Sequence, residues 1–188
     1  MVKIEHRFSL RLLPLGDKMS VQIRPAVIED LPALTDLYNH YIVNTATTFD
    51  IEPYTLEGRA VWFSQFAPTG RYRLLVAEQD GEILGYACSG QFKPKRAYET
   101  SVEVSIYLKP NTKGRGLGTA LYLELFEQLE TEDVHRAYAG ITLPNEASHI
   151  IHEKFGFESV GVYLEVGRKF GQYWDVEWFE KEIHRSCI

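Results

Sequence analysis

The stretch that decides the fold is Val102-Glu103-Val104-Ser105-Ile106-Tyr107-Leu108, then Lys109-Pro110-Asn111-Thr112, then Lys113-Gly114-Arg115-Gly116-Leu117-Gly118-Thr119. Its first part is apolar and rich in β-branched residues apart from Glu103 and Ser105, which predicts a strand. Leucines at positions 117, 121, 125 and 129 then recur at i, i+4 spacing, which predicts a helix with one face on a sheet. The glycines between them predict a tight turn from strand to helix.

A helix that begins directly after glycines is suited to bind an anion. Its first amides have no intrahelical partner, and the positive end of the helix dipole points the same way. Glycines, which lack Cβ, let the backbone approach a bulky group closely. We therefore predict a phosphate or pyrophosphate site at residues 113–119, with an ordinary strand-to-helix loop as the alternative. The pattern is neither a Walker A loop nor the dinucleotide fingerprint, because no Gly-Lys-Ser/Thr ends it and the glycine spacing differs.

Composition excludes several classes of protein. The chain has 188 residues and is 45% hydrophobic, which predicts one domain with a sizeable core. A net charge of −6 gives a nucleic-acid-binding role no support. No apolar run approaches the ~18–20 residues that span a bilayer. Cys88 and Cys187 lie far apart without metal-ligand spacing, so we expect a reducing cytoplasm, a buried Cys88 thiol and no metal.

The remaining elements predict an α/β (α+β) fold. A single domain over residues 21–183 would hold a mixed, mostly antiparallel sheet with helices on both faces, because Asp80-Gly81 marks a hairpin and Asp30, Thr55 and Asn145 can cap helices. Residues 1–20 are expected to be an N-terminal extension, with either Met19 as the natural start or the first 18 residues as a dispensable addition, and 184–188 a tail. The alternative for the extension is that Arg7–Leu13 docks as an extra element. The predicted strands cover 21–24, 74–78, 83–88, 102–108, 137–142, 160–166 and 174–182, and the helices 31–43, 55–66, 117–129 and 145–155.

The glycine-rich segment resembles a known motif. Lys113-Gly114-Arg115-Gly116-Leu117-Gly118 is similar to the acyl-CoA-binding motif of the GNAT superfamily of N-acetyltransferases, Gln/Arg-x-x-Gly-x-Gly/Ala, with Lys113 in place of the usual Gln or Arg. The resemblance implies a GNAT-type fold over residues 21–183 and acetyl-CoA as co-substrate. It also implies that Gly114, Arg115, Gly116, Leu117, Gly118 and Thr119 bind that co-substrate.

Further segments resemble one branch of that superfamily, the phosphinothricin acetyltransferases. They are Leu37–Ile42 with Thr47–Phe49, Thr100–Leu108, Asn145–Phe157 and Val166–Gly171. The branch acetylates the amino group of phosphinothricin or of methionine sulfoximine and sulfone, so the resemblance implies a small-molecule amine as partner and a homodimer. At Gln172-Tyr173-Trp174 the sequence departs from the branch, because the aromatic residue has moved.

Glu103 and His152 are the predicted catalytic residues. An ammonium group cannot attack a thioester, and an amine with a pKa near or above ~8 is mostly protonated at neutral pH. Glu103, a lone carboxylate in an apolar strand, could remove the proton, with an exposed glutamate on a polar face of the strand as the alternative. His152 stands where many members of the superfamily have tyrosine, so the resemblance implies that it relays a proton or protonates the leaving thiolate. A packing role is the alternative for His152, and His149 is expected to face solvent.

Binding residues follow from the same strand and its flanks. One amide in Val104–Leu108 would polarise the thioester carbonyl. Ile106, Tyr107 and Leu108 would pair with the pantetheine arm like an added strand, and Asn145 would hydrogen-bond that arm. The resemblance places the amine substrate on Val104 and Ser105 and on the loop residues Lys93, Pro94 and Lys95. The two lysines would hold its carboxylate, and the alternative is that both are solvated surface residues. Phe49 and Tyr98 could line the side-chain pocket.

Two other functions remain open at this level. One is acetylation of a protein N-terminus or another amine. The other is a non-catalytic acyl-CoA-binding module that regulates a partner, against which the presence of both Glu103 and His152 argues.

Overall fold

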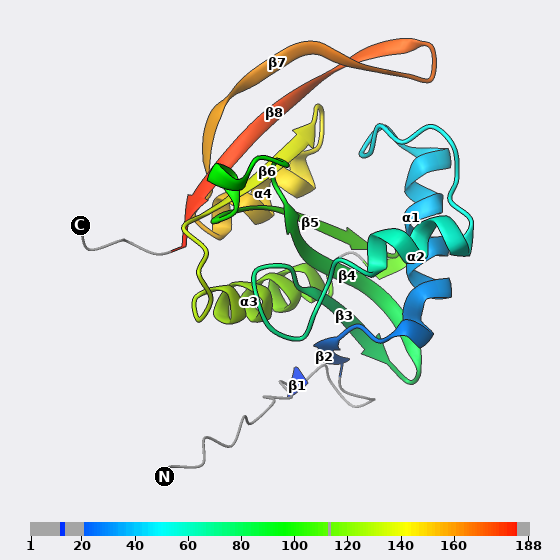
Figure 1. The fold of residues 1–188 in the computed structure, drawn as a ribbon. Coiled ribbons are helices and arrows are strands. Elements are labelled where there is room, and N and C mark those ends of the chain that lie inside the picture. Colours follow the sequence, from blue (N-terminus) through cyan, green and yellow to red (C-terminus); the bar gives the residue numbers. More distant parts are fainter. Residues whose placement is uncertain (1–11, 14–20, 113, 184–188) are drawn as a thin grey trace, which may run out of the picture.

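The structure, a computed structural model, describes residues 12–13, 21–112 and 114–183. Eight strands form one sheet in the order β1-β2-β3-β4-β5-β6-β8-β7 (Figure 1). The strands are β1 (Leu12–Leu13), β2 (Val21–Pro25), β3 (Leu74–Gln79), β4 (Glu82–Gln91), β5 (Ser101–Leu108), β6 (Arg136–Thr142), β7 (Glu158–Lys169) and β8 (Gln172–Glu182). The α-helices are α1 (Leu31–Asn44), α2 (Leu56–Phe63), α3 (Leu117–Leu129) and α4 (Glu146–Lys154).

The sheet is antiparallel except at one pair of strands. β5 and β6 run parallel and are in register only from Ser101 opposite Arg136 to Glu103 opposite Tyr138. The predicted hairpin around Asp80-Gly81 is confirmed, because β3 and β4 pair antiparallel across it. The expected mixed, mostly antiparallel sheet with helices on both faces is therefore confirmed.

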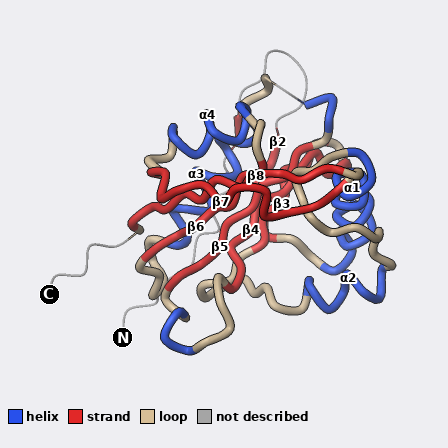
Figure 2. The backbone as a smooth tube through the Cα atoms, turned by 90° about the horizontal axis from the view of Figure 1, so that it is seen from above, coloured by secondary structure: helices blue, strands red, loops and turns tan. Residues whose placement is uncertain are grey.

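Helices cover the two faces of the sheet in pairs (Figure 2). α3 and α4 pack on one face, where Leu117, Leu121, Leu125 and Leu129 of the predicted stripe are all buried in the larger core cluster. α1 and α2 pack on the other face, around Tyr86 in a second cluster. β5 contributes to both clusters because its side chains alternate: Val102 and Val104 lie in the first and Tyr107 against the second.

The long hairpin β7–β8 arches away from the body and reaches the loop between α1 and α2 (Figure 1). Two contacts hold it there. The Lys169 ammonium donates to the carbonyl of Thr48 at 2.7 Å. The Phe49 ring lies so close to Gly167 that a Cβ added to this glycine would be 2.2 Å from it. The hairpin and the loop therefore form a roof, by which we mean Thr48 and Phe49 together with Gly167 and Lys169.

Some details differ from the prediction. Asp30 does precede α1, but its side chain caps nothing in that helix, because it is bound by Arg24 at 2.7 and 2.8 Å and by the Val27 amide at 2.9 Å. The final strands are longer than predicted because residues 167–169 and 172–173 extend the ladder. Three 3₁₀ turns, at 28–30, 96–98 and 110–112, were not predicted. In the N-terminal extension, Leu12 and Leu13 pair with β2, which agrees with the alternative of an added element, whereas Met19 and the tail lie outside the described residues.

Within the described ranges, no helix is long and apolar enough to cross a membrane. The thiol of Cys88 is free and buried, as expected. Burial raises its pKa to about 12, so it is protonated at neutral pH.

Candidate active site

A crevice opens where β5 and β6 separate. It is lined by residues of both strands and of the elements around them: Thr47, Val104, Ser105, Ile106, Tyr107, Tyr122, Ala139, Gly140, Ile141, Thr142, Asn145, Ser148 and His152. Ser105 and Tyr107 reach it from the face that carries α1 and α2, and Tyr122 and His152 from the face that carries α3 and α4. The crevice therefore connects the two faces of the sheet between the diverging strands.

Glu103 lies at the point where the crevice begins, in the last pair of β5 and β6 that is in register. Its neighbours Val102 and Val104 are buried toward α3, so its side chain points to the opposite face, the one that carries α1 and α2. Burial alone raises the pKa of the Glu103 carboxyl above its ordinary value. A carboxylate that is partly desolvated in this way is a stronger base than an exposed one.

The glycine turn lies on the face of the sheet opposite Glu103, at the start of α3. Gly114 and Gly116 both have positive φ, 77° and 74°, a conformation that favours glycine. Ala120 donates the first intrahelical hydrogen bond, to the carbonyl of Gly116 at 3.0 Å, so the amides of residues 117–119 precede the hydrogen-bonded ladder. A Cβ on Gly118 would meet Ile106 of β5 at 3.4 Å, which shows how closely this helix start approaches the crevice strand.

His152 and Tyr122 form a buried pair at the crevice. The Nδ1 atom of His152 lies 2.7 Å from the carbonyl of Ser148, which can only accept, so Nδ1 carries the proton. Nε2 then accepts from the Tyr122 hydroxyl, at 3.0 Å. Burial lowers the pKa of His152, which keeps the ring neutral at pH 7. In this pair the tyrosine is the proton donor toward the histidine, and sequence reasoning did not single out Tyr122.

The structure brings only some of the other predicted residues to the crevice. Asn145 caps α4 by accepting from the Ser148 amide at 3.2 Å, and it also lines the crevice. Lys93 and Lys95 are solvent-exposed. Pro94 and Lys95 border a different depression, beside the loop between α2 and β3, and the structure does not bring them to the crevice. His149 does not face solvent as expected, because its ring packs on Phe179 and its Nε2 lies 3.4 Å from Glu177.

Sequence reasoning also missed Arg59 of α2, a cation that is buried on the same face of the sheet as Glu103. Its side chain is buried, with 4% of the residue exposed. The guanidinium lies 4.0 Å from the centre of the Tyr38 ring and 3.5 Å from that of Trp62, and it donates to the Tyr86 hydroxyl at 3.2 Å. The only sequence signal for it is a charged residue in an otherwise apolar helix face, which is common on surface helices.

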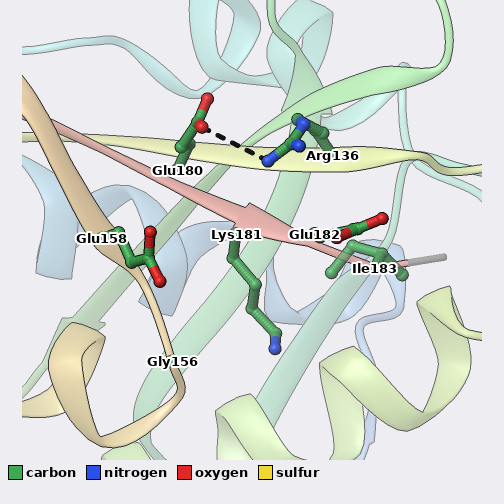
Figure 3. Close-up of a pocket in the computed structure, with 7 residues that line it drawn as sticks. All are labelled: Arg136, Gly156, Glu158, Glu180, Lys181, Glu182 and Ile183. Atoms are coloured by element: carbon green, nitrogen blue, oxygen red, sulfur yellow. Dashed lines mark hydrogen bonds and ion pairs between the residues drawn. The ribbon is translucent and has the colours of Figure 1, made fainter. Parts of the chain in front are cut away.

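A second depression is mainly polar and lies away from the crevice, near the ends of β6 and β8 (Figure 3). Its charged groups compensate one another, as in the ion pair of Arg136 with Glu180 at 3.3 Å. None of the predicted site residues lines it. Among the described residues, no group of three or more His, Cys, Asp or Glu could hold a metal ion.

Comparison with known proteins agrees with this geometry. Residues 23–178 match a protein family described as an acetyltransferase (GNAT) domain. The chain belongs to the GNAT acetyltransferase family. The crevice between β5 and β6, the glycine turn and Glu103 are therefore parts of a GNAT domain.

Three relatives of this GNAT chain are informative. A phosphinothricin N-acetyltransferase of Streptomyces coelicolor is 55% identical over 87% of this chain and 96% of its own length. An L-methionine sulfoximine/L-methionine sulfone acetyltransferase of Pseudomonas paraeruginosa is 35% identical over 88% of this chain and 96% of its own length. The crystal structure of a phosphinothricin acetyltransferase from Sinorhizobium meliloti in complex with AcCoA has a TM-score of 0.81 and 31% identity, and covers 86% of this chain and 88% of that one.

Proposed function

We propose that this protein transfers an acetyl group from acetyl-CoA to the amino group of a small amino acid or analogue of the phosphinothricin or methionine sulfoximine and sulfone type. The observation that carries the proposal is the position of Glu103 at the point where β5 and β6 separate. The resemblance to relatives that carry these substrates in their names supports the same substrate class.

The donor would lie along the crevice. Beyond Glu103, the described part of β5 pairs with no residue of β6, so backbone groups there can pair with the amides of a pantetheine arm. The carbonyl of Leu108 already accepts from the Tyr41 hydroxyl at 2.7 Å, and an arm at this residue would compete with that bond. Ile106, Tyr107 and Leu108 would make this pairing, with Asn145 on the opposite side. The diphosphate would then bind the amides at residues 114–119, next to the positive end of α3.

The reaction itself removes two protons from the acceptor nitrogen and delivers one to the leaving thiolate. Glu103 would take a proton from the acceptor's ammonium, directly or through one water, and the freed amine would attack the thioester carbon. A backbone amide of β5 near Val104 or Ser105 would stabilise the developing oxyanion. The C–S bond then breaks, and the thiolate takes a proton from the Tyr122–His152 pair. The attacking nitrogen loses its second proton, which passes through water to restore the pair, so that an amide and the free thiol of CoA are left. No covalent enzyme intermediate is needed.

We also infer a homodimer. β7 is the edge strand of the sheet, and apolar side chains lie exposed along it and its hairpin tip, where a soluble monomer would leave them in water. They are Val160, Val162, Tyr163, Leu164, Val166, Phe170 and Tyr173. A molar mass near 43 kDa by light scattering is expected for two copies of the 21.6 kDa chain, and a monomer at assay concentration would contradict this part. The cytoplasmic location stays a prediction.

A thiol-release assay tests the function. The protein is incubated with acetyl-CoA and a panel of phosphinothricin, methionine sulfoximine, methionine sulfone, proteinogenic amino acids, polyamines and short peptides. We expect the highest kcat/KM for the first three compounds. Preferential turnover of peptides would favour a protein N-terminal acetyltransferase. CoA binding by calorimetry with no thiol release for any amine would favour a non-catalytic module.

A further inference from the structure

Arg59 differs from the other arginine that is buried in the described chain. Arg73, with 7% of the residue exposed, donates to a carboxylate oxygen of Glu132 and to backbone carbonyls. Arg59, with 4% exposed, contacts no carboxylate, and its Nε is buried without a hydrogen-bond partner in the described structure. Asp50, in the adjoining loop, accepts a bond at 2.6 Å from the Tyr38 hydroxyl instead.

The aromatic rings offset only part of the cost of burying this charge. A cation over an aromatic face gains roughly 0.5–2 kcal/mol, whereas desolvating an ion costs several kcal/mol. The Tyr38 and Trp62 rings lie 4.0 and 3.5 Å from the guanidinium carbon, and neither ring supplies a hydrogen-bond acceptor to Nε. Buried charges are usually paired. The unpartnered Nε is therefore an unused donor suited to an anion.

The position of Arg59 relative to Glu103 defines which anion would fit. Along β4, the side chains of Tyr86 and Cys88 lie on the face that carries α1 and α2, and Gly90 occupies the next position of this row. Arg59 contacts Tyr86 at one end of this row, and Glu103 is opposite Gly90 at the other end. Besides burial, which is the largest cause, Arg59 lowers and Glu103 raises the pKa of the Cys88 thiol, which lies between them. Tyr86 and Gly90 are separated by about 13 Å along the strand, at about 3.3 Å per residue.

Tyr107 connects the crevice with this row. Tyr107 lines the crevice, is opposite Tyr86 on the neighbouring strand, and packs on it with ring centres 5.3 Å apart. An amino acid with an acid group at its γ position, with one hydrogen bond at each end, spans about 11 Å. This length is close to the separation of the two ends of the row, so one acceptor could place its amino group at Glu103 and its distal acid at Arg59.

We propose that Arg59 is a specificity-determining residue that favours acceptors with an anionic group at the distal end of the side chain. The inference rests on the proposed function, because it assumes that Glu103 holds the acceptor's amino group. It assigns the distal phosphinate or carboxylate to the buried Arg59, whereas Lys93 and Lys95 lie in the exposed loop.

Two acceptors of similar length test this assignment. Phosphinothricin has an anionic distal group and methionine sulfone a neutral one, and both carry the same α-amino and α-carboxylate groups. In Arg59→Met, kcat/KM for phosphinothricin should fall 10- to 100-fold, mainly through KM, while that for methionine sulfone should change less than 3-fold. Arg59→Lys keeps the charge but not the planar set of donors. The ratio of kcat/KM for phosphinothricin to kcat/KM for methionine sulfone should therefore fall less in this variant than in Arg59→Met.

Arg73→Met is the matched control, because it removes a buried arginine that is already paired with Glu132. It should lower stability in denaturant without changing the ratio of the two acceptors. Equal losses for both acceptors in Arg59→Met and Arg59→Lys, or no loss in either, would overturn the proposal. If Arg59→Met fails to fold, the ratio measured for Arg59→Lys decides.

A binding measurement separates this inference from the proposed function. Phosphinothricin is titrated by calorimetry into wild-type protein and Arg59→Lys, both saturated with CoA. If no amine is acetylated, the proposed function fails, yet binding that weakens at least several-fold in the variant still supports the role of Arg59. Normal acetylation with binding that is unchanged in the variant rejects the role of Arg59 and leaves the proposed function standing.

Discussion

Glu103 and Tyr138 are the last residues that β5 and β6 hold opposite each other before the two strands separate. The general base proposed here therefore lies at the point where the sheet changes from a continuous ladder to an open crevice. A side chain in this position is held by the paired strands, and the next residues of β5, from Val104 on, line the crevice.

Replacing Glu103 by Gln should abolish the base without disturbing the fold. The amide has nearly the same shape but cannot take up a proton at neutral pH, so kcat should fall by roughly 10²–10⁴-fold. The dissociation constant of CoA should change little, because the proposed donor contacts are backbone groups of β5 and α3. Steady-state kinetics and calorimetry measure the two quantities, and unchanged turnover would show that Glu103 is not the base.

The same carboxyl predicts opposite effects of pH on rate and on stability. Because burial raises the pKa of Glu103, the acid side of the kcat profile should lie above the pH at which an exposed glutamate titrates. The folded state favours the protonated form, so the stabilising contribution of this group is complete below the unfolded pKa and is lost as pH rises through the folded pKa. Glu103→Gln should therefore be more stable than wild type at neutral pH in denaturant titrations, and equal or lower stability there would contradict the desolvation of this side chain.

Tyr122→Phe should separate the second proton transfer from the first. The variant removes the hydroxyl that donates to Nε2 of His152 and leaves that buried nitrogen without a partner, which costs about 1–3 kcal/mol of stability. If the pair protonates the leaving thiolate, kcat should also fall, and less so for an acetyl donor with a more acidic thiol. A loss of stability with an unchanged kcat would assign a packing role to Tyr122 and His152.

Gly116→Ala tests the helix start at the donor site. An alanine at φ 74° is strained by about 1–2 kcal/mol although nothing crowds its Cβ. Relief of that strain would shift the amides at residues 117–119, so KM for acetyl-CoA should rise several-fold. Gly70→Ala, at φ 92° and equally uncrowded, provides the control on a loop away from the crevice. It should lose similar stability, and an equal rise in KM for both variants would argue against a donor site at α3.

Gly167→Ala tests the roof over the acceptor. Its Cβ would lie 2.2 Å from the Phe49 ring, so the ring and the hairpin must separate. We expect a lower midpoint of thermal unfolding and a higher KM for the amine, with KM for acetyl-CoA nearly unchanged. The control is Gly171→Ala at the hairpin tip, where no neighbour lies within 4 Å but φ is 78°, so this variant also loses stability through backbone strain and only its KM for the amine serves as the comparison. If both variants have the same KM for the amine, the roof does not bound the acceptor pocket.

The sequence predicted those parts of the fold that depend on local patterns. The leucine stripe of α3, the Asp80-Gly81 hairpin and the caps Thr55 and Asn145 are short-range signals, and each corresponds to the structure. The capping role predicted for Asp30 was wrong. A carboxylate before a helix can either cap the helix or form an ion pair, and here the side chain of Asp30 pairs with Arg24 of β2.

The candidate site was predictable only in part for the same reason. Glu103 stands out as a charge in an apolar strand, whereas the contact of Tyr122 with His152 joins two helices and leaves no local pattern. Arg59 has no distinctive spacing either, since its burial depends on rings contributed by α1 and β4. Lys93 and Lys95 were chosen by resemblance, and the structure places both on an exposed loop.

The separation of β5 from β6 also allows acetyl-CoA binding to be measured directly by hydrogen–deuterium exchange. Amides of β5 beyond Glu103 that point toward the crevice have no strand to protect them from solvent deuterium in the empty protein. Their exchange should slow when a pantetheine arm occupies the gap, while amides that bond to β4 keep the same rate. Mass spectrometry of the peptide that contains residues 104–108 would thus report occupancy even for a variant that has lost all turnover.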